Sequence, residues 1–327
     1  MSPTSASVRR RDVIYAQRAS GDLHLDLVMP AQSDAVPVIV FVHGGGWFTG
    51  DRRLCPDLRE HFCARGFAMA SVDYRLTGDA LFPAQLHDVR AAIRHLRANA
   101  AELGLDPTRI GIWGASAGGH LAALVGLLSA VAQLPGEESA DGDAGVQAVA
   151  ESYGPATLVE GDVDPGVPLP GVESAAETPE GRLIGGDPAE LPVAARDASP
   201  LYSVTSDAPP FQISHGTGDL MVGHRHSELL YDALARAGVE VDLYLVDGYR
   251  HGFLNPPNRS DVPMPPAMDN GRLSSEGPAP ARHLSARGTE RTEARTRFGF
   301  DDIGDFFARH LAISHDLTTT TISGDNR

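Results

Sequence analysis

Apolar residues along this chain form short continuous runs, separated by longer stretches with helical periodicity. The runs are typical of strands buried on both faces of a sheet, and they cover 36–42, 67–72, 109–114, 146–150, 211–214 and 239–246. The clearest helical stretch has apolar residues at three- and four-residue steps, namely Leu86, Val89, Ile93, Leu96 and Leu103. This alternation predicts an α/β fold with a mainly parallel central sheet and helices on both faces.

Further elements complete the predicted order. Two strands are expected near the start, at 13–15 and 23–28, and the second alternates polar and apolar residues as an antiparallel edge strand does. Helices are expected at 52–65, 120–128 and 227–237, and an amphipathic helix at 300–311 closes the pattern.

Four segments lack such periodicity within what we interpret as one domain spanning 1–327. We expect a loose arm at 1–11 and a cap-like region of loops and short helices over the site at 156–200. Residues 254–296 are rich in Pro, Gly, Arg, Ser and Glu, which predicts a long insertion, disordered or loosely ordered. A polar tail is expected at 314–327.

Charge and cysteine content narrow the class of protein. The formal net charge is −16, which argues against nucleic acid or an anionic membrane as a partner because both require basic patches. Cys55 and Cys63 lie on one predicted helix, so a disulfide between them is not expected and a reducing compartment is favoured. With no apolar segment behind the basic N-terminal residues, we expect a cytoplasmic protein. The sequence does not determine the oligomeric state, and a homodimer is one alternative.

The stretch Gly114-Ala-Ser-Ala-Gly-Gly119 joins a predicted strand to a predicted helix. A serine at such a turn, flanked by small residues, is typical of a nucleophile elbow. Small neighbours are needed because the turn is strained and the backbone approaches the substrate closely. Ser116 is therefore the candidate nucleophile.

A serine hydroxyl needs a base, and the base needs an acid that orients it. In elbow folds these follow in the order serine, acid, histidine, which favours Asp219 and His251, both placed after predicted strands. The rival acid is Asp247, and the rival histidines are His215, His224 and His226. We interpret His215 as a structural residue, or one that supports the site from behind. No metal site is expected, because no carboxylate-rich or cysteine cluster accompanies the histidines.

A second glycine-rich loop, His43-Gly-Gly-Gly-Trp47, follows the strand predicted at 36–42. Backbone amides must converge on the negative oxygen of a tetrahedral intermediate, and side chains would obstruct them. The amides of Gly44, Gly45 and Ala117 are therefore the candidate oxyanion hole. Trp47 and Tyr153 are candidates for substrate contact, although packing beneath the loop is the favoured role for Trp47.

Several motifs together carry a family resemblance. They are His43-Gly-Gly-Gly-Trp47, Asp73-Tyr-Arg-Leu76, Gly114-Ala-Ser-Ala-Gly-Gly-His-Leu-Ala122, Ser199-Pro-Leu-Tyr202, Pro209-Pro-Phe211, His215-Gly-Thr-Gly-Asp219 and His251-Gly-Phe253. The chain resembles the α/β-hydrolase superfamily, in particular its bacterial esterase and lipase-like branch with feruloyl esterase, acetyl esterase and kynurenine-formamidase-like members. The resemblance covers roughly 12–253 and the last helix, and it implies the same triad and oxyanion hole. The sequence departs from the pattern after Asp219, where Leu-Met-Val-Gly-His replaces the usual approach to a Val-Pro pair.

These features predict a serine carboxylesterase that acts on a small or medium acyl ester through an acyl-enzyme and needs no cofactor. One alternative keeps the triad but changes the bond or acceptor, as in an acyltransferase, thioesterase, formamidase or cyclising enzyme of a secondary pathway. Another is a binding protein that retains the fold without the reaction. The predicted partner is in each case a small molecule.

Overall fold

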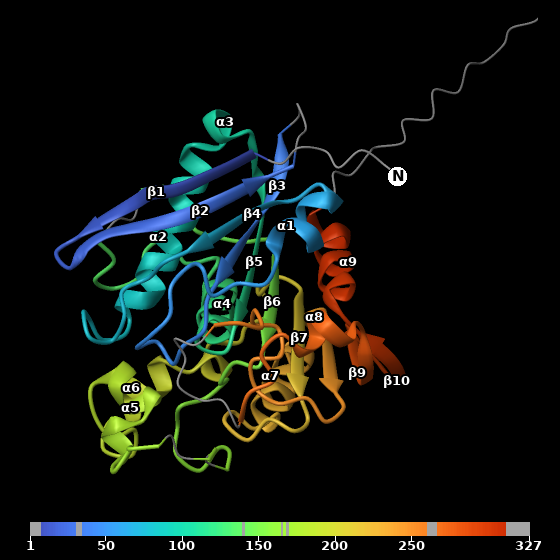
Figure 1. The fold of residues 1–327 in the computed structure, drawn as a ribbon. Coiled ribbons are helices and arrows are strands. Elements are labelled where there is room, and N and C mark those ends of the chain that lie inside the picture. The colour runs from blue at the N-terminus through green and yellow to red at the C-terminus, as the bar shows by residue number, and fades with distance from the viewer. Residues whose placement is uncertain are drawn as a thin grey trace, which may run out of the picture.

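One twisted sheet runs through the molecule (Figure 1). The computed structural model describes residues 8–30, 35–138, 141–164, 166–167, 170–259 and 267–311. Within them the sheet has ten strands in the order β1-β2-β4-β3-β5-β6-β7-β8-β9-β10. These are β1 (Val8–Arg18), β2 (Gly21–Met29), β3 (Val36–Val42), β4 (Ala68–Val72), β5 (Leu105–Ala115), β6 (Ala148–Ser152), β7 (Phe211–Gly216), β8 (Val241–Val246), β9 (Ala279–Arg287) and β10 (Glu290–Phe298). Strands β3 to β8 are mutually parallel, and antiparallel pairs extend both ends. The predicted mainly parallel sheet is confirmed.

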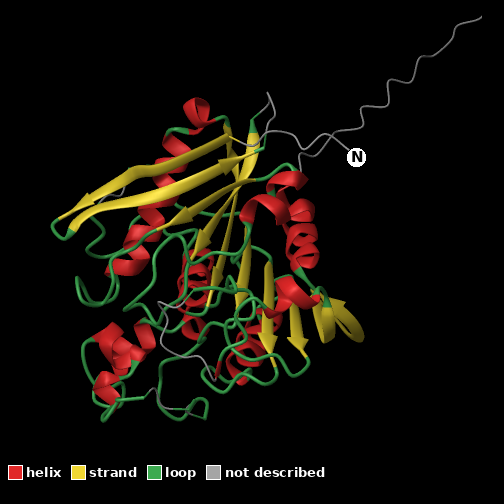
Figure 2. Ribbon diagram, viewed as in Figure 1, coloured by secondary structure: helices red, strands yellow, loops and turns green. Residues whose placement is uncertain are grey.

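Helices cover both faces of this sheet (Figure 2). They are α1 (Leu58–His61), α2 (Ala84–Ala98), α3 (Ala100–Leu103), α4 (Ala117–Leu127), α5 (Pro179–Ile184), α6 (Pro192–Asp197), α7 (Arg225–Arg236), α8 (Arg272–Glu276) and α9 (Phe300–Leu311). Helices α2, α4 and α7 share one apolar core with the sheet, whereas α1, α8 and α9 share the core on the opposite face.

Strand β3 shows why a continuous apolar run is needed in the middle of the sheet. Val38 and Val40 pack into the core beneath α2 and α4, while Ile39 and Phe41 pack into the core beneath α9. Because successive side chains of a strand point to opposite faces, a strand covered on both sides must be apolar at every position.

The prediction of a helix over 52–65 is wrong in its length. Only Leu58–His61 is α-helical, followed by a 3₁₀ turn at Cys63–Arg65. Asp57 caps the helix by accepting from the amides of Arg59 and Glu60 at 3.0 and 2.9 Å. Upstream, Arg52 is instead held by the carboxylates of Asp12, Asp26 and Asp73. The preceding segment is a turn for this reason, and Cys55 is not on a helix.

A second correction concerns residues 254–296, which were predicted to be a disordered or loosely ordered insertion. Residues 260–266 lie outside the described part, but β9 and β10 form a regular hairpin whose register runs from Glu290–Arg287 to Phe298–Ala279. Strand β9 also pairs with β8. Only the last residue of β10 is buried, so the hairpin depends on backbone hydrogen bonds and ion pairs. Strand β10 therefore lacks the apolar pattern that marks a buried strand.

The region expected to be cap-like, 156–200, does form loops and short helices beside one end of the sheet (Figure 2). Helix α5 contacts the glycine-rich loop, since Arg182 stacks over the ring of Phe48 at 5.1 Å. Residues 8–11, expected to belong to a loose arm, are instead part of β1, which begins at Val8. Residues 1–7 and the tail expected at 314–327 lie outside the described residues.

Candidate active site

Three loops at the carboxyl ends of β5, β7 and β8 bring Ser116, Asp219 and His251 together. The Nε2 atom of His251 lies 2.8 Å from the hydroxyl oxygen of Ser116. Its Nδ1 atom lies 2.6 Å from Oδ2 of Asp219. The parallel strands place these loops at one edge of the sheet, where reactive groups gather in open α/β folds. The rival acid Asp247 is instead paired with Arg295 on β10.

Ser116 occupies a strained turn between β5 and α4. Its backbone has φ 55° and ψ −123°, a region that residues with a Cβ rarely occupy. The turn closes only because two glycines flank it: a Cβ on Gly114 would lie 2.0 Å from the Gly118 carbonyl oxygen, and a Cβ on Gly118 would lie 2.0 Å from that of Val42. The amide of Ser116 is also fixed, donating to the Ser152 carbonyl at 2.8 Å.

Asp219 is buried and accepts several hydrogen bonds. Its Oδ1 atom accepts from the amides of Met221 and Val222 at 2.9 and 3.0 Å. Burial alone would raise the pKa of Asp219, but His251 and His215 outweigh burial and hold the pKa well below its usual range. The carboxylate therefore stays ionised and orients the Nδ1–H of His251.

The glycine-rich loop after β3 lies directly beside the serine. A Cβ on Gly44 would be 3.2 Å from the Cβ of Ser116, which places this backbone against the candidate nucleophile. Among the residues that the structure describes, the amides of Gly44, Gly45 and Ala117 have no hydrogen-bond acceptor. His43 anchors the loop from below, with its ring stacked on Tyr74 at 4.3 Å and its carbonyl accepting from the Tyr74 hydroxyl at 3.0 Å.

Trp47 and Tyr153, the two candidates for substrate contact, are both buried beside the site. Trp47 is 1% exposed, and its ring meets the edge of His120 at 5.0 Å. Tyr153 is fully buried, and its ring centroid lies 5.0 Å from that of His251. The burial of Trp47 is consistent with the packing role favoured for it, and contact of either side chain with substrate stays a prediction. Both have positive φ, at 60° and 43°, so backbone strain is concentrated around Ser116.

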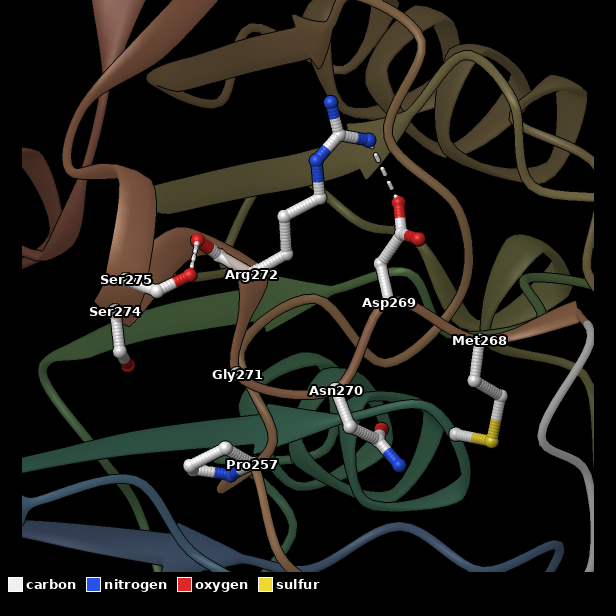
Figure 3. Close-up of a pocket in the computed structure, with 8 residues that line it drawn as sticks. All are labelled: Pro257, Met268, Asp269, Asn270, Gly271, Arg272, Ser274 and Ser275. Carbon is white, nitrogen blue, oxygen red and sulfur yellow. Dashed lines mark hydrogen bonds and ion pairs between the residues drawn. The ribbon is translucent and has the colours of Figure 1, made fainter.

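The segment after His251 holds that histidine in place. The backbone of His251 forms a parallel bridge with Met268, and its carbonyl accepts from the amide of Asp269 at 2.8 Å. Met268 also lines an open surface pocket of about 580 Å³, whose other lining residues are Pro257 and residues between Asp269 and Ser275 (Figure 3). Ser116, Asp219 and His251 are not among the residues that line it. The segment thus contributes to the site by fixing a backbone.

Three more polar side chains lie behind the site. His215 contacts Asp219, with Nε2 at 3.3 Å from Oδ2, and Ser227 contacts His215 at 2.7 Å. Glu151, at the end of β6, is fully buried beside Ser227, and burial raises its pKa to about 8. The sequence singled out only His215; the one signal for Glu151 was a carboxyl within an otherwise apolar strand.

Neither of the other candidate histidines joins this group. His226 accepts a hydrogen bond from the amide of Ala156 at 3.2 Å through its Nδ1 atom, and His224 stands at the start of α7. Across the described residues, no group of three or more His, Cys, Asp or Glu side chains is placed to hold a metal ion. None of the helices in the described part of the chain is long and apolar enough to cross a membrane.

Comparison with known proteins places this geometry in a family context. The model of the family BD-FAE matches residues 25–234. The chain is 31% identical over 248 residues to the esterase LipC of Mycobacterium tuberculosis, covering 75% of this chain and 60% of LipC. It is 29% identical over 295 residues to the isoprenylcysteine alpha-carbonyl methylesterase ICME of Arabidopsis thaliana, covering 84% of this chain and 66% of ICME. The chain spans about half to three-fifths of the mycobacterial relatives LipC, LipQ and LipM.

Solved structures agree with this placement. A truncated carbohydrate esterase from gut microbiota matches with a TM-score of 0.67 and 32% identity, covering 76% of this chain and 91% of that structure. The thermophilic esterase Est2 of Thermogutta terrifontis matches with a TM-score of 0.60 and 30% identity, covering 80% and 87%. Because the family model matches well over half of the chain, this protein belongs to the BD-FAE family, within the esterase branch of the α/β-hydrolase superfamily.

Proposed function

We propose that this protein is a serine carboxylesterase that cleaves small or medium acyl esters through an acyl-enzyme intermediate. The observation that carries the proposal is the continuous contact from Asp219 through His251 to Ser116, at 2.6 and 2.8 Å. Esterases among both the sequence relatives and the structural neighbours support the same class of reaction.

In this proposal Ser116 attacks the ester carbonyl while His251 Nε2 takes the hydroxyl proton. The tetrahedral oxyanion is held by the amides of Gly44, Gly45 and Ala117, the last at the N-terminus of α4, where the helix dipole favours negative charge. Collapse expels the alcohol, to which His251 returns the proton. Water, activated by the same histidine, then releases the acid and restores Ser116.

The test compares hydrolysis of p-nitrophenyl acetate and butyrate by the wild type and by Ser116→Ala. We expect the variant to lose the acylation burst and at least about 10⁴-fold in kcat, because it lacks the nucleophile. Ser206→Ala, an exposed serine outside the site, is the matched control and should keep wild-type turnover. Undiminished turnover in a folded Ser116→Ala protein would rule out the proposal.

A further inference from the structure

Asp219 faces a second imidazole in addition to that of His251. His215, four residues earlier and fully buried, has Nε2 at 2.8 Å from the Val222 carbonyl oxygen and 3.3 Å from Oδ2 of Asp219. Its other ring nitrogen, Nδ1, lies 2.7 Å from the hydroxyl of Ser227 on α7. Both nitrogens of this ring are thus engaged inside the protein.

These contacts determine which nitrogen carries the proton. A carbonyl oxygen and an ionised carboxylate can only accept hydrogen bonds, so Nε2 of His215 must be the donor. Nδ1 of the neutral ring is then an acceptor, and the hydroxyl of Ser227 is placed to donate to it. The single Nε2–H points to the Val222 carbonyl at 2.8 Å and lies 3.3 Å from Oδ2 of Asp219, so this carboxylate oxygen contacts two imidazoles, one of which contacts Ser116.

We propose that His215 is a positioning residue for the proposed ester hydrolysis, and that its Nε2–H holds Asp219 and limits how strongly this carboxylate favours the protonated form of His251. Ser227 supports this tautomer of His215, which the Val222 carbonyl selects, by donating to Nδ1. The role rests on the proposed function, because it acts on the acid of the same site.

The proposal predicts a direction for the pH dependence. A hydrogen bond to a carboxylate spreads its charge, so removal of this donor strengthens the attraction between Asp219 and the imidazolium form of His251. His251 would then remain protonated, and unable to act as a base, up to a higher pH. The acid limb of the kcat/KM profile should move upward accordingly.

Other titratable groups also lie near Asp219 and His215. They are His226 on α7, Glu151 on β6 and Tyr153 after β6, with Asp162 and His120 facing His226. Burial, with a smaller contribution from the neighbouring His215, lowers the pKa of His226 to about 4. Burial raises the pKa of Glu151 to about 8 and that of Tyr153 well above its usual range.

The first experiment compares His215→Leu with His215→Gln. The leucine variant lacks the donor, and we expect kcat to fall roughly tenfold with KM unchanged, less than the 10²–10⁴-fold contribution of a general base itself. The acid limb should move up by about half a pH unit or more. Glutamine can place an N–H near the position of Nε2, so it should restore the limb. His87→Leu, a buried histidine on α2, controls for the loss of a core imidazole and should leave the limb in place.

A second readout does not depend on turnover. In a Ser116→Ala background, NMR titration of the His251 ring should show its midpoint at higher pH when His215 is leucine, and at the original pH when it is glutamine. Ser227→Ala should move the midpoint in the same direction by a smaller amount. This variant replaces His215→Leu as the test if His215→Leu does not fold. Unmoved midpoints in these variants would overturn the role of His215. If wild-type protein neither hydrolyses esters nor reacts with a fluorophosphonate, the proposed function fails, while the NMR titration still decides whether His215 tunes His251.

Discussion

At the scale of single residues, this site combines strained backbone with buried polar side chains. Ser116, Trp47 and Tyr153 all have positive φ, at a cost on the order of 1–3 kcal/mol each. Glu151 is buried beside them and accepts from the amide of Gly154. Burial raises its pKa to about 8, against the opposing effects of Gly154 and Ser227. The carboxyl of Glu151 therefore holds a proton in the folded protein at neutral pH.

This protonated carboxyl makes stability depend on pH. In the unfolded chain Glu151 ionises near its ordinary pKa of 4.5, so between there and about 8 only the folded state binds the proton. The free energy of unfolding therefore falls as pH rises through this window, by an amount on the order of 3–5 kcal/mol from this group.

We predict that Glu151→Gln removes this dependence, because the amide resembles the protonated acid and does not ionise. Denaturant unfolding of the variant and the wild type from pH 5 to pH 9 should show the variant gaining relative stability as pH rises. Glu290→Gln on the exposed strand β10 is the control and should run parallel to the wild type. A constant difference between Glu151→Gln and the wild type across this range would contradict the prediction.

At the scale of elements, buried ion pairs connect helix α2 to the loop before β6. Arg90 and Arg94 lie on the helical stretch with the clearest apolar periodicity, yet both are buried and contact Glu137 at 2.8 and 2.5 Å. Burial alone would raise the pKa of Glu137, but hydrogen bonds from Arg94 and Arg90 outweigh it and lower the pKa to about 2. The loop is thus held against α2 by an ion pair that water does not screen.

We predict that Glu137→Gln destabilises the protein by about 3 kcal/mol, because it leaves buried guanidinium groups without their counter-charge. The adjacent Glu138 pairs with Arg18 and Arg75 but has 51% of its side chain exposed, so Glu138→Gln should cost less than about 1 kcal/mol. Denaturant unfolding at pH 7 measures both. The Glu137 effect should shrink as pH falls from 4.5 toward 2, where the native carboxylate becomes protonated, and an effect that persists at pH 2 would argue against this ion pair.

At the scale of the whole molecule, the chain offers few nucleophiles that could compete with Ser116. All 27 of its basic residues other than histidine are arginine, and it contains no lysine. Burial raises the pKa of Cys55 to about 11, which leaves little thiolate near neutral pH. An activated ester therefore meets no lysine amine, and little thiolate at Cys55.

We predict that a brief reaction with p-nitrophenyl acetate, quenched in acid, leaves one acetyl group per chain on the peptide that contains Ser116. Mass spectrometry of the intact protein and its peptides measures this stoichiometry. The Ser116→Ala protein should carry no adduct beyond slow acetylation of the terminal amine. Stable acetylation of the Ser116→Ala protein at a different side chain would show that Ser116 is not the reactive group.

Most of the sheet could be predicted because its strands are covered on both faces and must be apolar at every position. The hairpin of β9 and β10 could not be predicted, because β10 is exposed. It pairs with β9 through backbone hydrogen bonds, which leave no pattern in the side chains. The burial of Arg90 was equally hidden, because helical periodicity assigns it to a polar face while Glu137 lies 47 residues further along the chain.

The sequence by itself determined the elbow at Ser116 and the order in which acid and base follow it. Small residues at a strand-to-helix turn and polar residues after apolar runs are local signals, and parallel strands place such residues at one edge. Only the tertiary structure decided that Tyr153 lies beneath His251, that Met268 fixes the His251 backbone, and that His215 shares Asp219. These contacts join residues distant in sequence or depend on the direction of a side chain, and no local pattern encodes either.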